Sequence, residues 1–310
     1  MLRWRLITGL SLFGAFMFAT FSTSVASPIL FTILVLLFWV AGIREALTLL
    51  TEKSSPLLMR IFRVAGAVSI ILSSSWGFQL QYRHTHSFMD WHTFQQKTLL
   101  SVLLISSIVL ILAVIEAIRQ PDFQIARARF QAQLTAWVWL LPAFISMICL
   151  FYYPGTTGRN TRLGPFLVLL AIMLVKAGDI GGYTMGRIAK ALRGTTHKII
   201  PRLSPGKSWE GFAGTLLFPP LVGVILLLIA GGPVTLSNGR CLSFADVALA
   251  GVFIAPFSLI GDLIESLFKR AAGEKDSGNL LPGMGGALDL LDSLCLAVPP
   301  LYFLATLFLL

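Results

Sequence analysis

Residues 98–118 read TLLSVLLISSIVLILAVIEAI, and this run decides the fold class. A single charged side chain, Glu116, interrupts it, and that residue stands close to the end of the run. A helix needs about 20 mostly apolar residues to cross a lipid bilayer. Residues 98–118 therefore predict a transmembrane helix.

The same pattern recurs along the whole chain. Apolar residues make up 56% of it and charged residues only 12%, and the mean hydropathy is +0.82. A soluble domain carries about 25% charged residues. We therefore predict an all-α polytopic membrane protein with about nine transmembrane helices. The predicted spans are 6–22, 28–50, 61–79, 98–118, 134–152, 163–186, 211–231, 245–264 and 288–310.

The positions of the basic residues predict the orientation. Most of the 24 lysines and arginines fall in alternate loops when the N-terminus is inside. By the positive-inside rule this predicts an N-in, C-out protein of the cell inner (plasma) membrane, with loops 187–210 and 265–287 both facing the cytoplasm. Arg3 and Arg5, followed by an apolar run that ends near Ser24, leave open a cleaved signal peptide.

The organisation follows from the spans. Residues 1–160 are predicted to hold about five N-terminal transmembrane helices, and residues 161–310 about four that surround a cytoplasmic-facing polar cavity. The net charge of +10 does not indicate nucleic acid binding, because the basic residues form short clusters between apolar runs. Such clusters suit lipid head groups or nucleotide phosphates.

Span 163–186 ends in polar residues that a lipid-facing helix should not contain. Lys176 and Asp179 are three residues apart, so they share a helix face and are expected to pair. Gly178, Gly182 and Gly186 recur every four residues, a stripe that lets another helix approach closely.

The most basic loop, 187–210, ends in the sequence SPGKSWEG at residues 204–211. Ser204, Lys207 and Ser208 stand just before the next predicted helix. Hydroxyls, an ammonium group and free backbone N–H groups at a helix start suit a phosphate. An ordinary cytoplasmic loop is the alternative.

Acidic residues surround a second, glycine-rich loop at 275–286. Asp262 lies on a polar helix stripe before the loop, with Glu265 or Ser266 and Lys269 one and two turns further on. Asp289 and Asp292 follow the loop. Mg²⁺ is held by one or two carboxylates together with substrate phosphates, so Asp262 and Asp289 are candidate ligands. The alternative is that acids early in a helix only favour its dipole.

These residues also form a long pattern with fixed gaps. Ser266, Lys269-Arg270, Lys275-Asp276, Gly278, Leu281-Pro282, Gly285-Gly286, Asp289 and Asp292 resemble the signature S-x-x-K-R-x4-K-D-x-G-x2-L-P-x-H-G-G-x-x-D-R-x-D of phosphatidate cytidylyltransferases (CDP-diacylglycerol synthases). The resemblance covers roughly residues 175–295. Two positions depart from it: Met284 replaces the histidine and Leu290 replaces the arginine.

The resemblance implies that CTP and phosphatidate react to give CDP-diacylglycerol and diphosphate in phospholipid biosynthesis. It implies a Mg²⁺ cofactor, leaves a second cation open, and names CTP, phosphatidate and membrane lipids as partners; a homodimer is left open. The implied metal ligands are Asp262, Asp289 and Asp292, the implied catalytic residues are Asp262, Asp289, Lys269, Arg270 and Asp276, and the implied substrate-binding residues are Ser204, Lys207, Ser208, Lys275, Asp179, Tyr183, Glu210 and Glu265.

Three other functions remain open. A transporter would explain the intramembrane Lys176 and Asp179, but it predicts charges spread over several spans. A CDP-alcohol phosphotransferase needs a different spacing of aspartates, which this sequence lacks. An enzyme that acts on another lipid phosphate, or an inactive relative, would be compatible with Met284 and Leu290.

Overall fold

The structure is a computed structural model, and it describes residues 2–21, 26–50, 56–82, 91–120, 122–153, 163–235 and 240–309. The end of the candidate signal peptide, near Ser24 and Val25, lies outside these residues.

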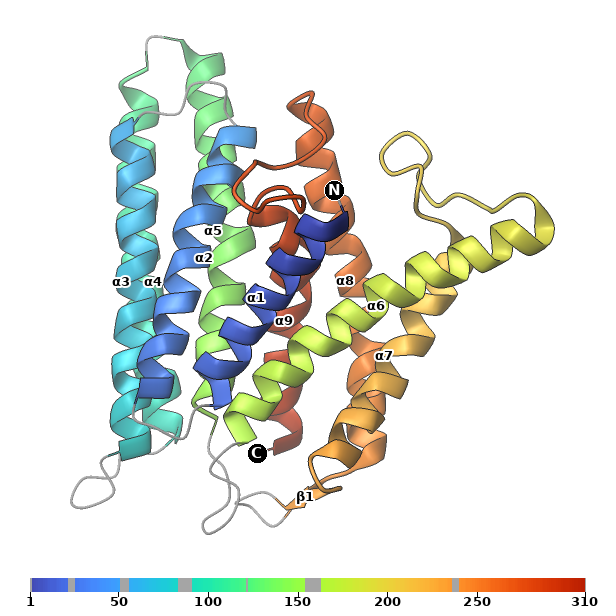
Figure 1. Cartoon of the computed structure of the whole chain (residues 1–310). Helices are drawn as coiled ribbons and strands as arrows, with labels where there is room; N and C mark the ends of the chain where they lie inside the picture. Colours follow the sequence, from blue (N-terminus) through green and yellow to red (C-terminus); the bar gives the residue numbers. More distant parts are fainter. Residues whose placement is uncertain are drawn as a thin grey trace. The chain divides into compact units, whose positions relative to one another are not determined.

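The residues that the structure describes are 83% helical, which confirms the all-α prediction (Figure 1). A short hairpin that the sequence did not predict is the exception: β1 (Val234–Thr235) pairs antiparallel with β2 (Cys241–Leu242). The helices in the described residues are α1 (Leu2–Phe21), α2 (Ala26–Leu50), α3 (Pro56–Tyr82), α4 (Trp91–Ile118), α5 (Phe123–Phe151), α6 (Leu163–Arg193), α7 (Trp209–Ile229), α8 (Phe244–Ala271) and α9 (Leu288–Leu309).

Eight of these helices, α2 to α9, are long and apolar enough to cross a membrane, which confirms a polytopic membrane protein. The apolar part of α1, Ile7–Phe21, is shorter. Helix α4 shows the lipid-facing character most clearly, because Leu100, Leu104 and Ile111 expose more than half of their surface. Acyl chains can cover such side chains without the free-energy cost that water would impose.

Several helices run further than the sequence predicted, and α6 and α8 do so at their C-terminal ends. Helix α6 continues to Arg193 and α8 to Ala271, so the first residues of the predicted loops 187–210 and 265–287 are helical. The prediction stopped where the apolar run stopped, but a helix can continue beyond the bilayer. Lys190 and Arg193 in the last turn of α6, and Lys269 and Arg270 in that of α8, favour this because cations stabilise a helix C-terminus.

The chain divides into two compact units. The first contains Met1–Tyr152 and Ala271–Leu291, and the second contains Tyr153–Arg270 and Asp292–Leu310. The glycine-rich loop thus belongs to the unit of the N-terminal helices. The predicted division at residues 160 and 161 remains a prediction.

The core of the first unit is aromatic. Trp39 on α2 is fully buried, and its ring meets those of Trp137 and Phe144 on α5 edge-on, with centroids 5.8 and 5.5 Å apart. Phe62 on α3 meets Trp137 in the same way at 5.4 Å. These contacts join α2, α3 and α5, and edge-to-face pairs add to the gain from burial.

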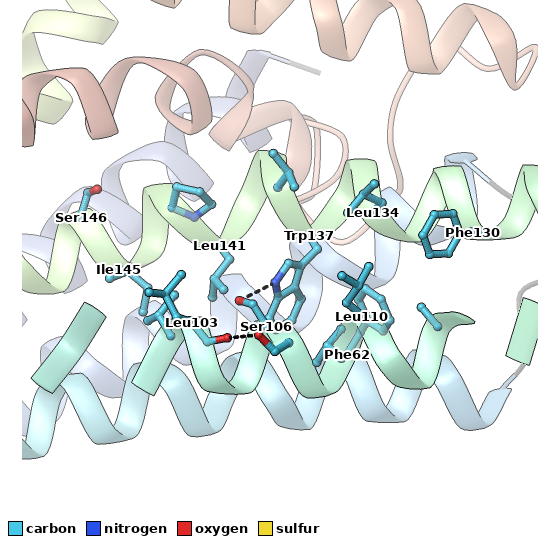
Figure 2. Close-up of a pocket in the computed structure, with 16 residues that line it drawn as sticks. Phe62, Leu103, Ser106, Leu110, Phe130, Leu134, Trp137, Leu141, Ile145 and Ser146 are labelled. Carbon is cyan, nitrogen blue, oxygen red and sulfur yellow. Dashed lines mark hydrogen bonds between the residues drawn. The ribbon is translucent and has the colours of Figure 1, made fainter. Parts of the chain in front are cut away.

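A cavity of about 480 Å³ lies beside this core, among α3, α4 and α5. Figure 2 shows Trp137 reaching from α5 to α4, where its Nε1 donates to Ser106 Oγ at 3.0 Å. None of the described residues that line the cavity is charged. Its lining therefore offers no cation to a nucleotide or a phosphate.

The second unit relies on backbone contact between α6 and α7. A Cβ added at Gly181 would lie 2.5 Å from the carbonyl oxygen of Gly214, so only glycine allows this approach. Thr215 Oγ1 on α7 donates to the carbonyl oxygen of Gly178 at 3.2 Å. The glycine stripe was correctly predicted to let a helix approach closely, and that helix is α7.

Candidate active site

Three carboxylates come together in the second unit. Asp262 and Glu265 lie one turn apart on α8, and Asp292 lies on α9. One oxygen from each carboxylate lies within 4.8 Å of the other two. The helices approach closely because position 261 is glycine: a Cβ there would lie 2.7 Å from the Asp292 carbonyl oxygen.

The dimensions of this carboxylate cluster suit a divalent cation. Ligands in an octahedron around Mg²⁺ lie about 2.1 Å from the ion, hence about 3 or about 4 Å from each other. Because the three carboxylate oxygens lie within 4.8 Å of one another, small side-chain movements bring them to these distances. Glu265 is completely buried, and a buried charge of this kind is costly unless a cation compensates it.

Two lysines neutralise part of this acidic charge. Lys207 forms an ion pair with Asp262, and Lys269 Nζ lies 2.6 Å from Glu265 Oε2, one turn away on α8. A short bridge between Lys198 and Ser208 positions Lys207, whose carbonyl accepts from Ile199 N at 3.2 Å. The cluster thus combines acids for a cation with ammonium groups for anions.

A second polar pair continues into α6. Lys176 Nζ lies 3.2 Å from Asp179 Oδ2, as the spacing of these residues predicted. Asp179 Oδ1 accepts from Ser293 Oγ on α9 at 3.2 Å. Ser293 was not predicted, although its place directly after Asp292 was a usable signal.

The residues of the loop before α7 mainly shape that loop. Ser208 is the N-cap of α7, and its Oγ accepts from Gly211 N at 3.1 Å. Glu210 accepts from the backbone N of His197 at 3.2 Å and lies 2.8 Å from its Nδ1. The carbonyl oxygen of Ser204 accepts from Lys207 N at 3.1 Å. These bonds fix the backbone that carries Lys207.

Tyr183 and Arg270 stand on the surface of the second unit. Tyr183 is 66% exposed, and its hydroxyl oxygen accepts from Arg187 Nη1 at 2.9 Å. Arg270, at the end of α8, is exposed as well.

Asp289 belongs to the first unit and has a different environment. Its Oδ2 accepts from Ser277 N and Gly286 N, both at 2.8 Å, and from Ser277 Oγ at 2.9 Å. Lys275 and Asp276 in the same loop are exposed. The predicted shared cation of Asp262 and Asp289 remains a prediction.

Two contacts were not predicted from the sequence. The resemblance assigned Glu265 to substrate binding, which stays a prediction, and the structure brings it together with Asp262 and Asp292. Glu45 on α2 was not assigned at all, yet it accepts from Ala287 N at 3.0 Å and Leu288 N at 2.8 Å. The available signal was its carboxylate inside a long apolar run.

The two variant positions of the signature lie in and next to this loop. Met284 donates its backbone N–H to the Leu281 carbonyl at 2.9 Å, and Leu290 donates to the Ala287 carbonyl at 3.2 Å. Both residues are partly buried. Their backbone bonds do not depend on the side chain, so the substitutions leave the turn intact.

Comparisons with known proteins agree with the chemistry of these residues. The chain is 42% identical over 137 residues to a phosphatidate cytidylyltransferase of Haemophilus influenzae, and this alignment covers 44% of each chain. It is 37% identical over 161 residues to the enzyme of Pseudomonas aeruginosa, and this alignment covers 52% of each chain. It is 33% identical over 168 residues to the enzyme of Bacillus subtilis, and this alignment covers 54% of this chain and 57% of the relative. The chain thus matches about half the length of these curated relatives. The profile of the cytidylyltransferase family matches residues 3–308, so the chain belongs to the cytidylyltransferase family.

Proposed function

We propose that this membrane protein is a phosphatidate cytidylyltransferase, which converts CTP and phosphatidate to CDP-diacylglycerol and diphosphate. The observation that carries the proposal is the carboxylate cluster of Asp262, Glu265 and Asp292 with its two lysines, in a chain of the cytidylyltransferase family. The names of the relatives favour phosphatidate as the acceptor.

The reaction joins two anions. A phosphate oxygen of phosphatidate attacks the α-phosphorus of CTP, a new P–O bond forms, and the bond to the diphosphate oxygen breaks. The attacking phosphate is already ionised, so it needs no general base. The demand on the protein is to hold two mutually repelling groups in line.

The family and the acidic cluster together suggest a divalent cation, and we propose Mg²⁺. Asp262, Glu265 and Asp292 would hold it, and the predicted contribution of Asp289 and of a second cation remain parts of the hypothesis. When bound, the ion polarises the attacked phosphoryl group and stabilises the leaving oxygen.

The chain's own cations would bind the phosphates. Lys207 and Lys269 already lie beside the cluster, where they pair with its carboxylates. Each can turn from a carboxylate to a phosphate oxygen, because an ammonium group has three donors. We assign the exposed Arg270 and Lys275 to the outer phosphates. Preorganised cations of this kind lower the barrier by a few kcal/mol each.

Polar residues around the cluster would complete substrate binding. The Ser208 oxygen accepts the capping bond, so its hydroxyl proton is available to the nucleotide, and Ser204 lies four residues earlier. Glu210 supports this loop through His197. We assign Asp179 and Tyr183 to the polar end of the lipid groove, and Asp276 to the support of the glycine-rich loop.

The location follows from the same scheme. We propose the inner membrane, with the N-terminus inside and the active site facing the cytoplasm, where CTP is found. The acyl chains of phosphatidate can then stay in the bilayer while the head group enters. A homodimer gains no support from the comparisons and forms no part of the proposal.

The test uses the full chain purified in detergent, with CTP labelled at its α-phosphorus, phosphatidate and Mg²⁺. Label is expected in a lipid product, and EDTA is expected to abolish the transfer. A parallel reaction with other lipid phosphates tests the alternative that Met284 and Leu290 leave open. Absence of lipid label with every acceptor would refute the proposal.

A further inference from the structure

Glu45 lies 232 to 243 residues before its partners in the chain. It is half-buried on α2, and its carboxylate reaches the loop that precedes α9. Its oxygens accept from Ala287 N at 3.0 Å, from Leu288 N at 2.8 Å and from Ser277 Oγ at 3.0 Å. All of these groups belong to the first unit.

These bonds complete the start of α9. The first N–H groups of a helix have no partner within it, and a negative charge there is favourable. Glu45 binds the N–H groups of Ala287 and Leu288, whereas those before and after them bind elsewhere: Gly286 N to Asp289 Oδ2 at 2.8 Å and Asp289 N to Ser277 Oγ at 3.2 Å. Four consecutive N–H groups are therefore satisfied by three side chains.

The loop is shaped to admit the Glu45 carboxylate. A Cβ at Gly278 would lie 2.8 Å from Glu45 Oε1, and a Cβ at Gly286 would overlap the other carboxylate oxygen. Two glycines of the family signature therefore stand where a larger residue would push Glu45 away. This is a second observation, independent of the hydrogen bonds, that the loop and Glu45 fit together.

Ser277 links Glu45 to Asp289. Its Oγ lies 3.0 Å from Glu45 Oε2 and 2.9 Å from Asp289 Oδ2, but a hydroxyl has one proton to donate. The two carboxylates therefore share it. If Asp289 turns toward a cation, Glu45 can keep Ser277 and the loop in place.

We propose that Glu45 is a positioning residue for nucleotidyl transfer: through the N–H groups of Ala287 and Leu288 and the hydroxyl of Ser277, it fixes the glycine-rich loop that carries Lys275 and Asp289. This inference rests on the proposed function. It assigns a part in the reaction to an N-terminal helix that lies outside the signature.

The first experiment needs no activity. Amide hydrogen exchange is measured on the full chain in detergent for the wild type, Glu45→Gln and Glu45→Ala. The amides of Ala287 and Leu288 are expected to exchange about tenfold faster in Glu45→Ala. Each amide loses one hydrogen bond, and the net free energy of such a bond corresponds to about a tenfold change in the exchange rate. Glu116→Gln is the matched control, since the partner of that carboxylate is Gln133 on α5. Unchanged exchange in both Glu45 variants would overturn the inference.

The second experiment separates positioning from mere stability. In the cytidylyl-transfer assay, kcat is expected to fall about 100-fold in Glu45→Ala while KM for CTP changes little, because misplaced groups slow the chemical step. Glu45→Gln keeps the side-chain size and one acceptor oxygen. This variant should therefore fold, and its kcat should lie between those of the wild type and Glu45→Ala. An unchanged kcat despite faster exchange would refute the positioning role.

The two experiments also separate the two proposals. If the wild type gives no lipid label but the exchange of Ala287 and Leu288 depends on Glu45, the proposed function fails and the structural contact stands, without its part in transfer. If the wild type is active and the Glu45 variants match it, only the inference fails.

Discussion

Two groups of acids are bound in opposite ways: those at the glycine-rich loop, in the first unit, and those of the carboxylate cluster, in the second. In the first, Glu45 and Asp289 are bound by backbone N–H groups and by Ser277. In the second, Asp262 and Glu265 are bound by the ammonium groups of flexible lysines, and Asp292 lies beside them. Amide donors are fixed by the backbone, whereas lysine side chains can leave. The first arrangement defines a shape, and the second can exchange its partners for a cation and a substrate.

Removing one charge from the carboxylate cluster should have the largest effect. Asp262→Asn is expected to reduce cytidylyl transfer about 1,000-fold, because it weakens the cation site and leaves Lys207 without its acidic partner. The rate of lipid labelling measures this. Asp246→Asn is the control, because Asp246 lies on the same helix but binds Ser243. Equal rates in Asp262→Asn and the wild type would contradict the assignment of the cluster.

Asp289→Asn tests whether Asp289 only shapes the glycine-rich loop or also helps the carboxylate cluster to bind a cation. Asparagine keeps an acceptor for Ser277 and Gly286 but removes the charge. If Asp289 contributes to the cation site, as we predict, transfer falls about 100-fold and more Mg²⁺ is needed for half-maximal rate. A titration with Mg²⁺ measures this. Wild-type behaviour would mean that Asp289 only shapes the loop.

Lys207→Gln should have a smaller effect, which is expected in kcat/KM for CTP. Loss of one charge-assisted contact is worth about 2 kcal/mol, or roughly 30-fold in kcat/KM for CTP. Steady-state kinetics at varied CTP measure this, with Lys190→Gln, at the exposed end of α6, as the control. The role of Lys207 would be rejected if both variants had the same kcat/KM.

The units also differ in packing, and this gives the smallest expected effect. The first unit packs aromatic rings, whereas α6 and α7 of the second touch through backbone at Gly181 and Gly214. Gly181→Ala should reduce stability by about 1 to 3 kcal/mol, since backbone cannot move aside for a Cβ. Thermal unfolding in detergent measures the change. Gly14→Ala on α1, where a Cβ meets nothing within 4 Å, should not lower the midpoint; equal midpoints for the two variants would count against the close contact.

The sequence predicted those features that are local. Apolar runs of about 20 residues identify the spans, and the three-residue spacing of Lys176 and Asp179 identifies their pair. It failed where a helix continued past the apolar run, as at Arg193, because hydropathy marks the bilayer and not the helix. It could not find the contact of Glu45 with Leu288, because no periodicity encodes a partner 243 residues away.

The same separation along the chain has a consequence for biogenesis. Ala287 follows Glu45 by 242 residues. A ribosome adds about 5 to 20 residues per second, so Ala287 is synthesised roughly 10 to 50 s after Glu45. During that interval α2 enters the bilayer with a carboxylate whose final amide donors have not yet been synthesised. Helix α9 thus completes a contact that α2 begins, and this step can occur only after helices α3 to α8 have been synthesised.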